Sequence, residues 1–327
     1  FWLKQLPSYA RVEPCRSPGP LRPICGSGTR VPAGFMSDTD GLRSRVGVSV
    51  AQDKSEDEGA KAAKELSVIV PTYNETENIR PLCERLFKAS KAAGLVVELL
   101  IVDDESPGTK ETASIAAELA KEGYKVRIHC RTREEGRGLS SAVLLGFDKA
   151  AYNTVLCMDA DLQHEPESVP EVALPVLEGT AEFSVGSRHV RGGGVGFEWS
   201  FLRRIVSRGA TLLAWPLAGS SDPMSGFFCT TKKVLKRGKG RFNLIGFKIG
   251  LEVMVRCRCR PIKDVPITFQ ERAAGESKLS AKQYKLYVEQ LIGLYFESYG
   301  FILVILLLVM MWFVVQLGSG AAKMLKK

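Results

Sequence analysis

The feature that most constrains the fold of this chain is an alternation, between residues 66 and 187, of short apolar runs with longer amphipathic segments. The apolar runs are rich in Val, Ile and Leu, a composition typical of buried strands. The segments between them have the length of helices, and two of them end at a glycine, Gly94 and Gly123, a residue that often terminates a helix. This order predicts an α/β fold with a mostly parallel, Rossmann-like central sheet.

The individual elements can be placed from the same pattern. The predicted strands cover residues 66–70, 97–103, 125–130, 154–159 and 182–187. The predicted helices cover residues 76–93, 109–122, 139–151 and 166–178. Ligands of such sheets bind at the carboxyl ends of the strands, so the polar residues that directly follow each apolar run are the first candidates for a functional site.

Acidic residues follow several of these strands, in the segments PTYNE (71–75), DDES (103–106) and DADLQ (159–163). If residues 159–163 are extended, alternate side chains share a face, and Asp159, Asp161 and Gln163 present hard oxygen ligands together. Such ligands suit Mg²⁺ or Mn²⁺, which also accept oxygens from a diphosphate. We therefore expect a divalent metal site after the fourth predicted strand.

Two glycine-containing segments offer a different interpretation. Gly136 and Gly138 lie between a predicted strand and a helix, and Asp159 follows about twenty residues later, as in a dinucleotide-binding fingerprint. The third glycine position of that fingerprint is occupied by Ser141, which makes this the weaker alternative. The glycine-rich run at residues 192–196 predicts a flexible loop rather than a phosphate cradle.

The net charge of +9 indicates an anionic partner, although nucleic acid, acidic lipid and phosphorylated small molecules would all satisfy it. Cations in the second half of the chain are scattered, and each alone is typical of a solvated surface. The segment DPMSGFF (222–228), which is apolar and contains glycine beside an acid, predicts an active-site loop. Cys257 and Cys259, two residues apart, are expected to be buried thiols rather than metal ligands.

The C-terminal region predicts membrane attachment. Residues 298–322 carry no charge, and their apolar centre predicts a transmembrane helix over residues 299–318. Residues 280–298 predict an amphipathic helix in the membrane interface, whose aromatic face, formed by Tyr284, Tyr287, Leu291, Leu294 and Tyr295, is turned toward lipid. Packing of this helix on the soluble domain is the alternative. Residues 319–327 form a short basic tail.

The N-terminal residues 1–64 lack both an apolar core and periodicity, so they are expected to form a disordered arm or leader. Since no signal-like apolar run precedes the predicted domain, we expect that domain to stay on the cytosolic side of the membrane.

The motifs PTYNE, VDDES, GLSSAV, MDADLQHEPE, VGSRHVRGG, DPMSGFF, GFKIGLE and AGESKLS occur in this order between residues 71 and 280. In this series the chain closely resembles the dolichyl-phosphate mannosyltransferase family, which belongs to the family 2 glycosyltransferases of the GT-A fold. The resemblance covers about two thirds of the chain, and DAD with LQH, DPMSGFF and GESKL are its most specific parts. It implies a GT-A domain over residues 65–279, and a single C-terminal span matches the type that needs no accessory subunits.

The resemblance implies transfer of mannose from GDP-mannose to dolichyl phosphate, with inversion and with Mg²⁺ or Mn²⁺. The reaction would take place on the cytosolic face of the endoplasmic reticulum membrane. Its product would serve protein glycosylation and GPI-anchor synthesis. One departure concerns the turn after the second strand, where the family's SPDGT reads SPGT (residues 106–109). The shorter turn leaves the cap of the following helix in question.

The resemblance also implies roles for particular residues. Those implied at the guanosine site are Pro71, Tyr73, Glu75, Val102 and Asp104. Those implied at the sugar diphosphate are Asp159, Ala160 and Asp161, with Asp161 and Gln163 at the metal. Those implied at the donor or acceptor phosphates are Arg188, Arg203, Ser207, Arg272 and Lys278. We add Lys248 as a further substrate-binding candidate, and the residues expected to act in catalysis are Asp159, Asp161 and Arg188.

The implied chemistry is consistent with the residues available. A phosphate acceptor is already an anion at neutral pH, so the reaction needs no strong general base, and the chain has only three histidines. The metal and the cations would stabilise the departing diphosphate. We expect His164, beside the acidic motif, to be structural.

Two alternatives remain. One is a dolichyl-phosphate glucosyltransferase that uses UDP-glucose. The other is a non-catalytic, tail-anchored nucleotide-binding adaptor, which should have lost Asp104, Asp159 and Asp161. No nucleic-acid partner is expected.

Overall fold

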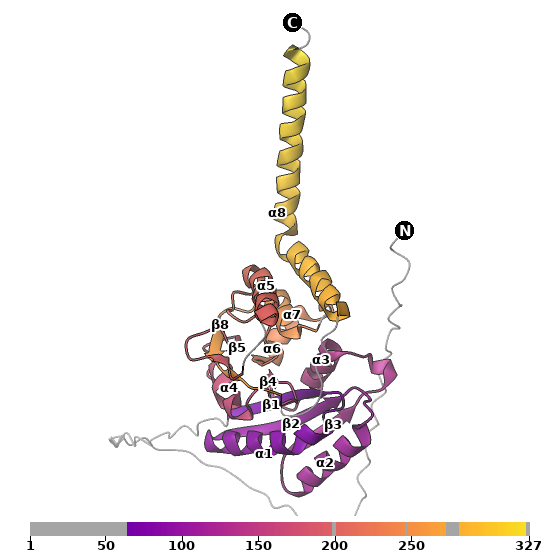
Figure 1. Ribbon diagram of the computed structural model, residues 1–327, viewed down its shortest axis with the longest axis vertical. Helices are drawn as coiled ribbons and strands as arrows, with labels where there is room; N and C mark the ends of the chain where they lie inside the picture. Colours follow the sequence, from indigo (N-terminus) through magenta and orange to yellow (C-terminus); the bar gives the residue numbers. More distant parts are fainter. Residues whose placement is uncertain (1–63, 198–200, 246, 273–280, 325–327) are drawn as a thin grey trace, which may run out of the picture. The chain divides into compact units, whose positions relative to one another are not determined.

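The computed structural model describes residues 64–197, 201–245, 247–272 and 281–324 (Figure 1). The predicted N-terminal arm, except for Lys64, lies outside the described residues, as do Lys278 and the last three residues of the predicted basic tail.

A seven-stranded sheet forms the centre of the described part of the chain, with the strand order β3-β2-β1-β4-β7-β5-β8. Its strands are β1 (Lys64–Thr72), β2 (Leu95–Asp103), β3 (Val126–Cys130), β4 (Thr154–Cys157), β5 (Phe183–Ser187), β7 (Phe228–Thr231) and β8 (Ile262–Pro266). Only β7 is antiparallel to its neighbours β4 and β5, and the other pairs are parallel. The predicted mostly parallel sheet is confirmed.

Helices cover both faces of this sheet (Figure 1). They are α1 (Thr76–Ala92), α2 (Thr109–Lys121), α3 (Leu139–Lys149), α4 (Val169–Leu177), α5 (Phe201–Ala218), α6 (Lys232–Leu235), α7 (Ile249–Arg256) and α8 (Ala281–Met324). Short 3₁₀ turns precede α3 at Arg133–Glu135, precede α4 at Pro166–Ser168 and follow α6 at Lys236–Gly238. The predicted glycine stops are confirmed, since Gly94 and Gly123 follow α1 and α2 with φ of +67° and +97°.

Two hydrophobic cores lie on the two faces of the sheet because successive side chains of a strand point in opposite directions. In β1, Val68 and Val70 belong to the core beneath α1, α2 and α4, whereas Ile69 belongs to the core beneath α3, α5, α7 and α8. Helix α3 approaches this second face closely: a Cβ on Gly146 would lie 2.5 Å from Ile69 Cγ2.

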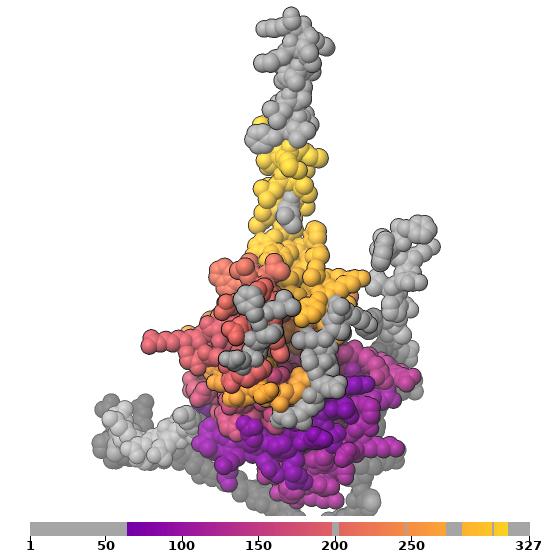
Figure 2. Space-filling model, viewed as in Figure 1, coloured from indigo at the N-terminus to yellow at the C-terminus, as the bar shows by residue number. Residues whose placement is uncertain are grey.

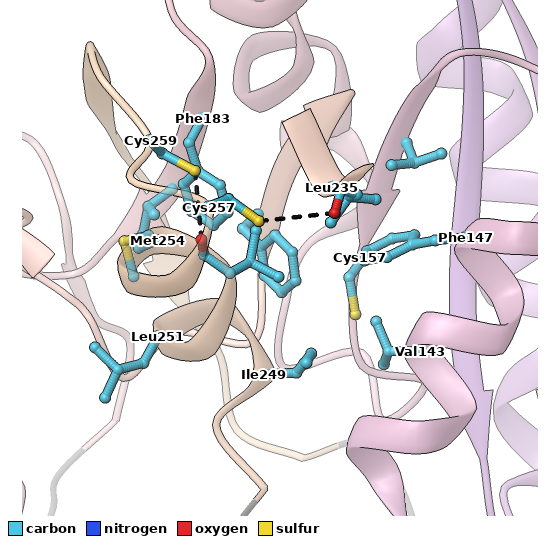
Figure 3. Close-up of a cluster of buried hydrophobic side chains, with 14 of the residues drawn as sticks. Val143, Phe147, Cys157, Phe183, Leu235, Ile249, Leu251, Met254, Cys257 and Cys259 are labelled. Atoms are coloured by element: carbon cyan, nitrogen blue, oxygen red, sulfur yellow. Dashed lines mark hydrogen bonds between the residues drawn. The ribbon is translucent and has the colours of Figure 1, made fainter. Parts of the chain in front are cut away.

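Cys257 and Cys259 are buried thiols at the end of α7, as predicted (Figure 3). Cys257 Sγ lies 3.9 Å from the carbonyl oxygen of Leu235, and Cys259 Sγ lies 3.5 Å from that of Val253. Both belong to the core on the α3 face, and neither joins a group of metal-binding side chains within the described residues.

The glycine-rich run at residues 192–196 is not the flexible loop that the sequence predicts. Gly194–Val195 form the short strand β6, which pairs in parallel with β9 (Thr268–Phe269). The glycines permit close packing here, since a Cβ on Gly193 would lie 2.5 Å from the carbonyl oxygen of Ser187. The run thereby ties the end of β5 to the segment after β8.

Helix α8 differs from the predicted division at residues 298 and 299. It bends by 51° between Gln283–Ile302 and Val304–Trp312. Among the described residues, no single helix has both the length and the apolarity needed to cross a bilayer, and this bent pair meets the test only when its halves are taken together. A separate transmembrane helix over residues 299–318 is therefore not confirmed.

The first part of α8 packs on the domain, and Figure 2 shows it against α5. The hydroxyls of Tyr287, Tyr295 and Tyr299 donate hydrogen bonds at 2.7, 2.8 and 2.9 Å. The acceptors are carbonyl oxygens of α5 spaced three residues apart, those of Ala210, Leu213 and Pro216. Tyr287, Leu291 and Leu294 of the predicted lipid-facing stripe are buried, so for these residues the alternative, packing on the domain, holds. The exposed stripe of the helix is instead formed by Tyr284, Val288, Ile292 and Phe296.

Candidate active site

The carboxyl ends of the parallel strands β1, β2, β4 and β5 bring most of the predicted site residues to one edge of the sheet, with Tyr73 and Glu75 following β1. Asp103 ends β2, Asp159 follows β4, and Arg188 follows β5. The antiparallel strand β7 begins at this same edge, so the preceding loop, residues 222–227, arrives beside the other strand ends. The sheet thus gathers segments that are far apart in the sequence.

The turn after β2 is organised by Asp103, a residue that the sequence analysis did not select. Its buried carboxylate accepts hydrogen bonds from Thr72 Oγ1, Ser106 N and Ser106 Oγ, each at 3.0 Å, and also from Thr109 Oγ1. Helix α2 begins after Gly108 without a side-chain cap. These hydrogen bonds to Asp103 therefore stabilise the shortened turn, and they hold the backbone that carries Asp104.

Asp104 connects this turn to the loop before α3. Its carboxylate accepts hydrogen bonds from Arg131 Nη1 at 2.9 Å and from the Gly138 amide at 2.8 Å. Arg131 is 2% exposed and also donates to Ser141 Oγ at 2.7 Å and to the carbonyl oxygen of Glu135 at 3.0 Å. Arg131 could not be recognised from the sequence, because a lone arginine at a strand end has no local signature of burial.

The other residues implied at the guanosine site and at the diphosphate differ in what they can present. Pro71, near the end of β1, and Glu75, after it, are partly buried, and Tyr73 is exposed. The side chains of Val102 and Ala160 are buried in the two hydrophobic cores, so these residues can reach a ligand only through their backbones.

The acidic motif forms a turn rather than the extended segment on which its predicted geometry depended. Strand β4 ends at Cys157, and Leu162 has a φ of +59°. As a result, the Asp159 side chain is 41% exposed while that of Asp161 is only 9% exposed. The premise of one shared face for Asp159, Asp161 and Gln163 was therefore wrong.

The oxygens of Asp161 and Gln163 nevertheless converge. Arg272 Nη2 lies 2.9 Å from Asp161 Oδ2 and 3.5 Å from Gln163 Oε1. The backbone N–H of Gln163 also donates to Asp161 Oδ1 at 3.2 Å. One oxygen of each predicted metal ligand thus lies within 3.5 Å of the same guanidinium nitrogen, Arg272 Nη2.

This donor set suits a metal that is shared with a substrate. Among the described residues there is no group of three or more His, Cys, Asp or Glu side chains that could hold an ion alone. Burial, followed by the charge of Asp159, raises the pKa of Asp161, and such a carboxylate favours a nearby cation. Two hard oxygen ligands leave most of an octahedral shell for diphosphate and water, as Mg²⁺ and Mn²⁺ require.

His164 is buried beside the acidic turn and contacts it through a hydrogen bond. Its ring packs against Phe227 and Phe269, with centroids 5.1 and 5.3 Å away. Its Nδ1 accepts a hydrogen bond from the Asp159 amide at 3.5 Å. Burial lowers the pKa of His164 to about 4, so the ring is neutral near pH 7. This geometry supports the structural role expected for His164.

Two cations, Arg188 and Lys248, lie near the acidic turn. Arg188 forms a two-point ion pair with the buried Asp222, and its guanidinium lies 5.0 Å from the Phe269 ring centroid. Lys248 Nζ donates to the carbonyl oxygen of Met224 at 2.8 Å. Burial, together with the charge of Arg188, lowers the pKa of Lys248 to about 8.

A small recess lies between Asp159 and Lys248. Its polar lining comes from Asp159, Ser225 and Lys248. Gly226 also lines it and approaches Asp159 so closely that a Cβ at this position would lie 3.1 Å from Asp159 Oδ2. The loop DPMSGFF therefore lies beside the acidic motif, where its composition placed it.

The two residues implied at the acceptor phosphate, Arg203 and Ser207, lie one turn apart on α5. Arg203 is exposed and Ser207 is partly buried. Lys278 cannot be placed because it lies outside the described residues.

Comparison with known proteins shows the family to which the chain belongs. The profile of glycosyl transferase family 2 matches residues 67–238. The fold resembles that of mannosyl-3-phosphoglycerate synthase from Rubrobacter xylanophilus, with a TM-score of 0.51 and 19% identity, covering 72% of this chain and 75% of that one. The protein is thus an enzyme of glycosyl transferase family 2 with the expected GT-A fold.

Relatives of known name define the family more closely. Dolichol-phosphate mannosyltransferase of Mycosarcoma maydis is 43% identical over 258 residues, which cover 75% of this chain and 86% of the relative. The Saccharomyces cerevisiae protein of the same name is 44% identical over 244 residues, covering 72% and 89%. The Pyrococcus furiosus protein is 42% identical, covering 66% and 60%. The chain belongs to the dolichol-phosphate mannosyltransferase family, and the resemblance in its motifs is confirmed.

Proposed function

We propose that the protein transfers mannose from GDP-mannose to dolichyl phosphate, with inversion at the anomeric carbon. The product, dolichyl phosphate mannose, would serve protein glycosylation and GPI-anchor synthesis. The observation that carries this proposal is the convergence of Asp161 and Gln163 oxygens on one cation, at the strand ends of a dolichol-phosphate mannosyltransferase fold. A metal-bound sugar diphosphate requires such an arrangement.

In this reaction an acceptor phosphate oxygen forms a bond to the anomeric carbon while the bond to the diphosphate oxygen breaks. A bound Mg²⁺ or Mn²⁺, held by Asp161 and Gln163, would supply positive charge for the departing diphosphate. Lys248, which lines the recess, and Arg188, after β5, would add further positive charge near the phosphates. Arg272 lies at the ligand oxygens themselves. No side chain has to remove a proton, because the acceptor phosphate is already an anion.

The donor can be tested directly. Membranes that contain the protein would be given labelled GDP-mannose or UDP-glucose together with dolichyl phosphate, with and without a chelator. We expect incorporation from GDP-mannose that the chelator abolishes and that added Mg²⁺ or Mn²⁺ restores. Equal or greater incorporation from UDP-glucose would overturn the donor assignment in favour of a glucosyltransferase.

The metal ligand can be tested by Asp161→Ala. Loss of the Asp161 carboxylate should reduce transfer by at least about 10²-fold, because the metal that would compensate the negative charge of the departing diphosphate is no longer held. The thermal unfolding midpoint of the detergent-solubilised protein should stay close to that of the wild type. Near-normal turnover in this variant would show that Asp161 does not hold the metal.

We further propose that a lipid bilayer covers the exposed apolar surface of α5 and α8. Leu212, Leu213 and Trp215 on α5 are more than half exposed, and the stripe of Tyr284, Val288, Ile292 and Phe296 continues this surface on α8. The stripe leads into the apolar segment that begins at Phe301. Such a surface on a monomeric domain is typical of a membrane or partner contact.

The proposed location is the endoplasmic reticulum membrane, with one C-terminal anchor and the catalytic domain facing the cytosol. Sealed microsomes treated with protease should lose the domain, whereas protection of the domain would contradict this orientation. We propose that no accessory subunit is needed, so the purified chain alone should transfer mannose in lipid vesicles.

A further inference from the structure

We propose that Asp222 is a positioning residue of the transferase site, which holds the guanidinium of Arg188 in the orientation needed to meet a phosphate. The proposal rests on the proposed function, because it assumes that Arg188 acts on the donor or acceptor phosphate. Asp222 was recognised in the sequence only as part of an active-site loop, without a role of its own.

Three hydrogen bonds fix Arg188 to this one carboxylate. Asp222 Oδ2 accepts from Arg188 Nε at 2.7 Å and from the Arg188 amide at 3.2 Å, and Oδ1 accepts from Nη2 at 2.9 Å. Backbone and side chain of Arg188 are therefore held together. Because the guanidinium is planar, a pair made through Nε and Nη2 also fixes where Nη1, on the opposite edge, is directed.

Asp222 is itself held by the edge strand β8. Its amide donates to Ser220 Oγ at 3.2 Å, and Ser220 Oγ donates to Asp264 Oδ1 at 2.6 Å. The Ser221 amide donates to Asp264 Oδ2 at 2.8 Å. Asp264 pairs in register with Val185 of β5, the strand that carries Arg188 at its end. A continuous set of hydrogen bonds thus connects the sheet to the guanidinium.

The flat face of Arg188 is supported by the layer that also supports the acidic turn. Its guanidinium lies 5.0 Å from the Phe269 ring centroid, Phe269 packs against His164, and His164 accepts from the Asp159 amide. The orientation of Arg188 and the position of Asp159 therefore share one support.

A contribution to the stability of the fold does not by itself explain the ion pair between Asp222 and Arg188. The Asp222 side chain is 0% exposed and that of Arg188 is 11% exposed, so both charges have lost most of their hydration. A buried pair of this kind is often no more stabilising than apolar residues of the same volume. Burial by itself would raise the pKa of Asp222, yet the hydrogen bonds and charge of Arg188 hold it below its usual range. The carboxylate stays charged and serves as a fixed partner.

A double-mutant cycle tests the inference. The variants are Asp222→Asn, Arg188→Gln and both together, with kcat and KM measured for GDP-mannose and dolichyl phosphate in vesicles. We expect Asp222→Asn to lower kcat/KM about 10- to 100-fold, since a displaced guanidinium loses much of its contact with the developing charge. The double variant should be no worse than Arg188→Gln alone, because Asp222 acts only through Arg188.

Glu98→Gln is the matched control. Glu98 is also fully buried, accepts hydrogen bonds from Arg127, and lies on β2 five residues before Asp103, on the order of 16 Å along the strand. Its activity should remain within about twofold of wild type. Should Asp222→Asn fail to fold, Ser220→Ala, which loosens the same loop, should give a smaller loss that also vanishes in the Arg188→Gln background.

The outcomes are distinct. Losses that multiply in the double variant, or an Asp222→Asn enzyme within twofold of wild type, would overturn the positioning role while the wild-type activity stands. A wild-type protein that transfers no mannose from GDP-mannose would instead refute the proposed function.

Discussion

Lys248 lies among charges that change how its ammonium titrates. Burial and the charge of Arg188 lower its pKa to about 8, although Asp159 and Asp222 act in the other direction. If the positive charge is needed at the phosphates, kcat/KM should fall as pH rises through about 8. The measurement is the pH profile of kcat/KM for GDP-mannose between pH 6.5 and about 9.5.

Stability should change in the opposite direction over part of this range. The pKa of Lys248 in the folded protein, about 8, lies below its ordinary value of 10.5. Between these values the unfolded chain binds the extra proton, so the contribution of Lys248 to the free energy of unfolding rises with pH. Lys248→Arg cannot titrate in this range and should have a flatter activity profile. An unchanged alkaline limb in that variant would assign the limb to another group.

Gly226 offers a steric test of the acidic turn. A Cβ there would lie 3.1 Å from Asp159 Oδ2, whereas a Cβ on Gly194 would meet nothing within 4 Å. Gly226→Ala should therefore displace the Asp159 carboxylate and weaken metal-dependent GDP binding about tenfold, in keeping with overpacking costs of ~1–3 kcal/mol. Titration calorimetry with GDP and Mn²⁺ measures this. Gly194→Ala should bind normally, and equal losses in both variants would contradict the steric explanation.

Residue identity alone located the acidic motif, but not its conformation. Asp161 and Gln163 could be selected because hard oxygen ligands after a buried strand are a local pattern. Their convergence depends on the left-handed backbone conformation of Leu162, which could not be predicted from the sequence. Arg131 and Asp222 were not given roles because each pairs with a charged residue from a distant part of the chain, Asp104 and Arg188. A distant partner cannot be recognised from the neighbouring sequence. Asp103 was not given a role although Ser106 and Thr109, which donate to it, follow closely in the sequence.

At the scale of elements, α8 is joined to the site through Gln290. Its Nε2 donates to the carbonyl oxygen of Lys248 and to Glu252 Oε1, each at 3.2 Å, and its side chain is almost fully buried. Gln290→Leu would leave both acceptors buried without this donor, at a cost of about 1–3 kcal/mol in the free energy of unfolding. It should also lower kcat/KM by shifting Lys248.

Urea unfolding in detergent, followed by circular dichroism, measures the first effect. Glu289→Gln is the control, because Glu289 is exposed on the neighbouring position of the same helix and should change the free energy of unfolding by less than about 0.5 kcal/mol. Equal stability of Gln290→Leu and Glu289→Gln would show that α8 does not stabilise the start of α7.

The strands and helices between residues 64 and 187 could be predicted well because each has a uniform period and a clear stop. The orientation of α8 could not, since the helix has two apolar faces, one rich in tyrosine and one aliphatic and aromatic, and both repeat every three to four residues. The tyrosine hydroxyls decide which face is buried, because they need the carbonyl oxygens of α5. The strand pair β6 and β9 joins segments too far apart for local pattern to reveal.

For the molecule as a whole, the structure separates what stabilises the domain from what attaches it to a membrane. A chain that ends after Gly300 keeps Tyr287, Gln290 and the other docking residues, but loses the apolar segment that follows. We expect it to fold, to transfer mannose to a short-chain, water-soluble polyprenyl phosphate, and to lose at least about tenfold in activity on dolichyl phosphate in vesicles.

Vesicle flotation and the two activity assays measure this difference. A chain that ends at residue 280 should serve as the comparison, because it loses the contacts of α8 with α5 and α7 and should be unstable. Loss of both activities in the chain that ends after Gly300 would mean that residues beyond 300 are needed for catalysis itself.

The insertion of β7 between β4 and β5 has a consequence for synthesis on the ribosome. Strands β1, β2 and β3 can pair as soon as residue 130 has emerged, but β4 waits about 70 further residues for its second neighbour, a separation that slows folding. Until then β4 is an open, apolar edge, the kind of edge that recruits other chains. The growing polypeptide therefore passes through a stage at which β1 to β4 are formed with one open edge, and a chaperone would have most to protect at that length.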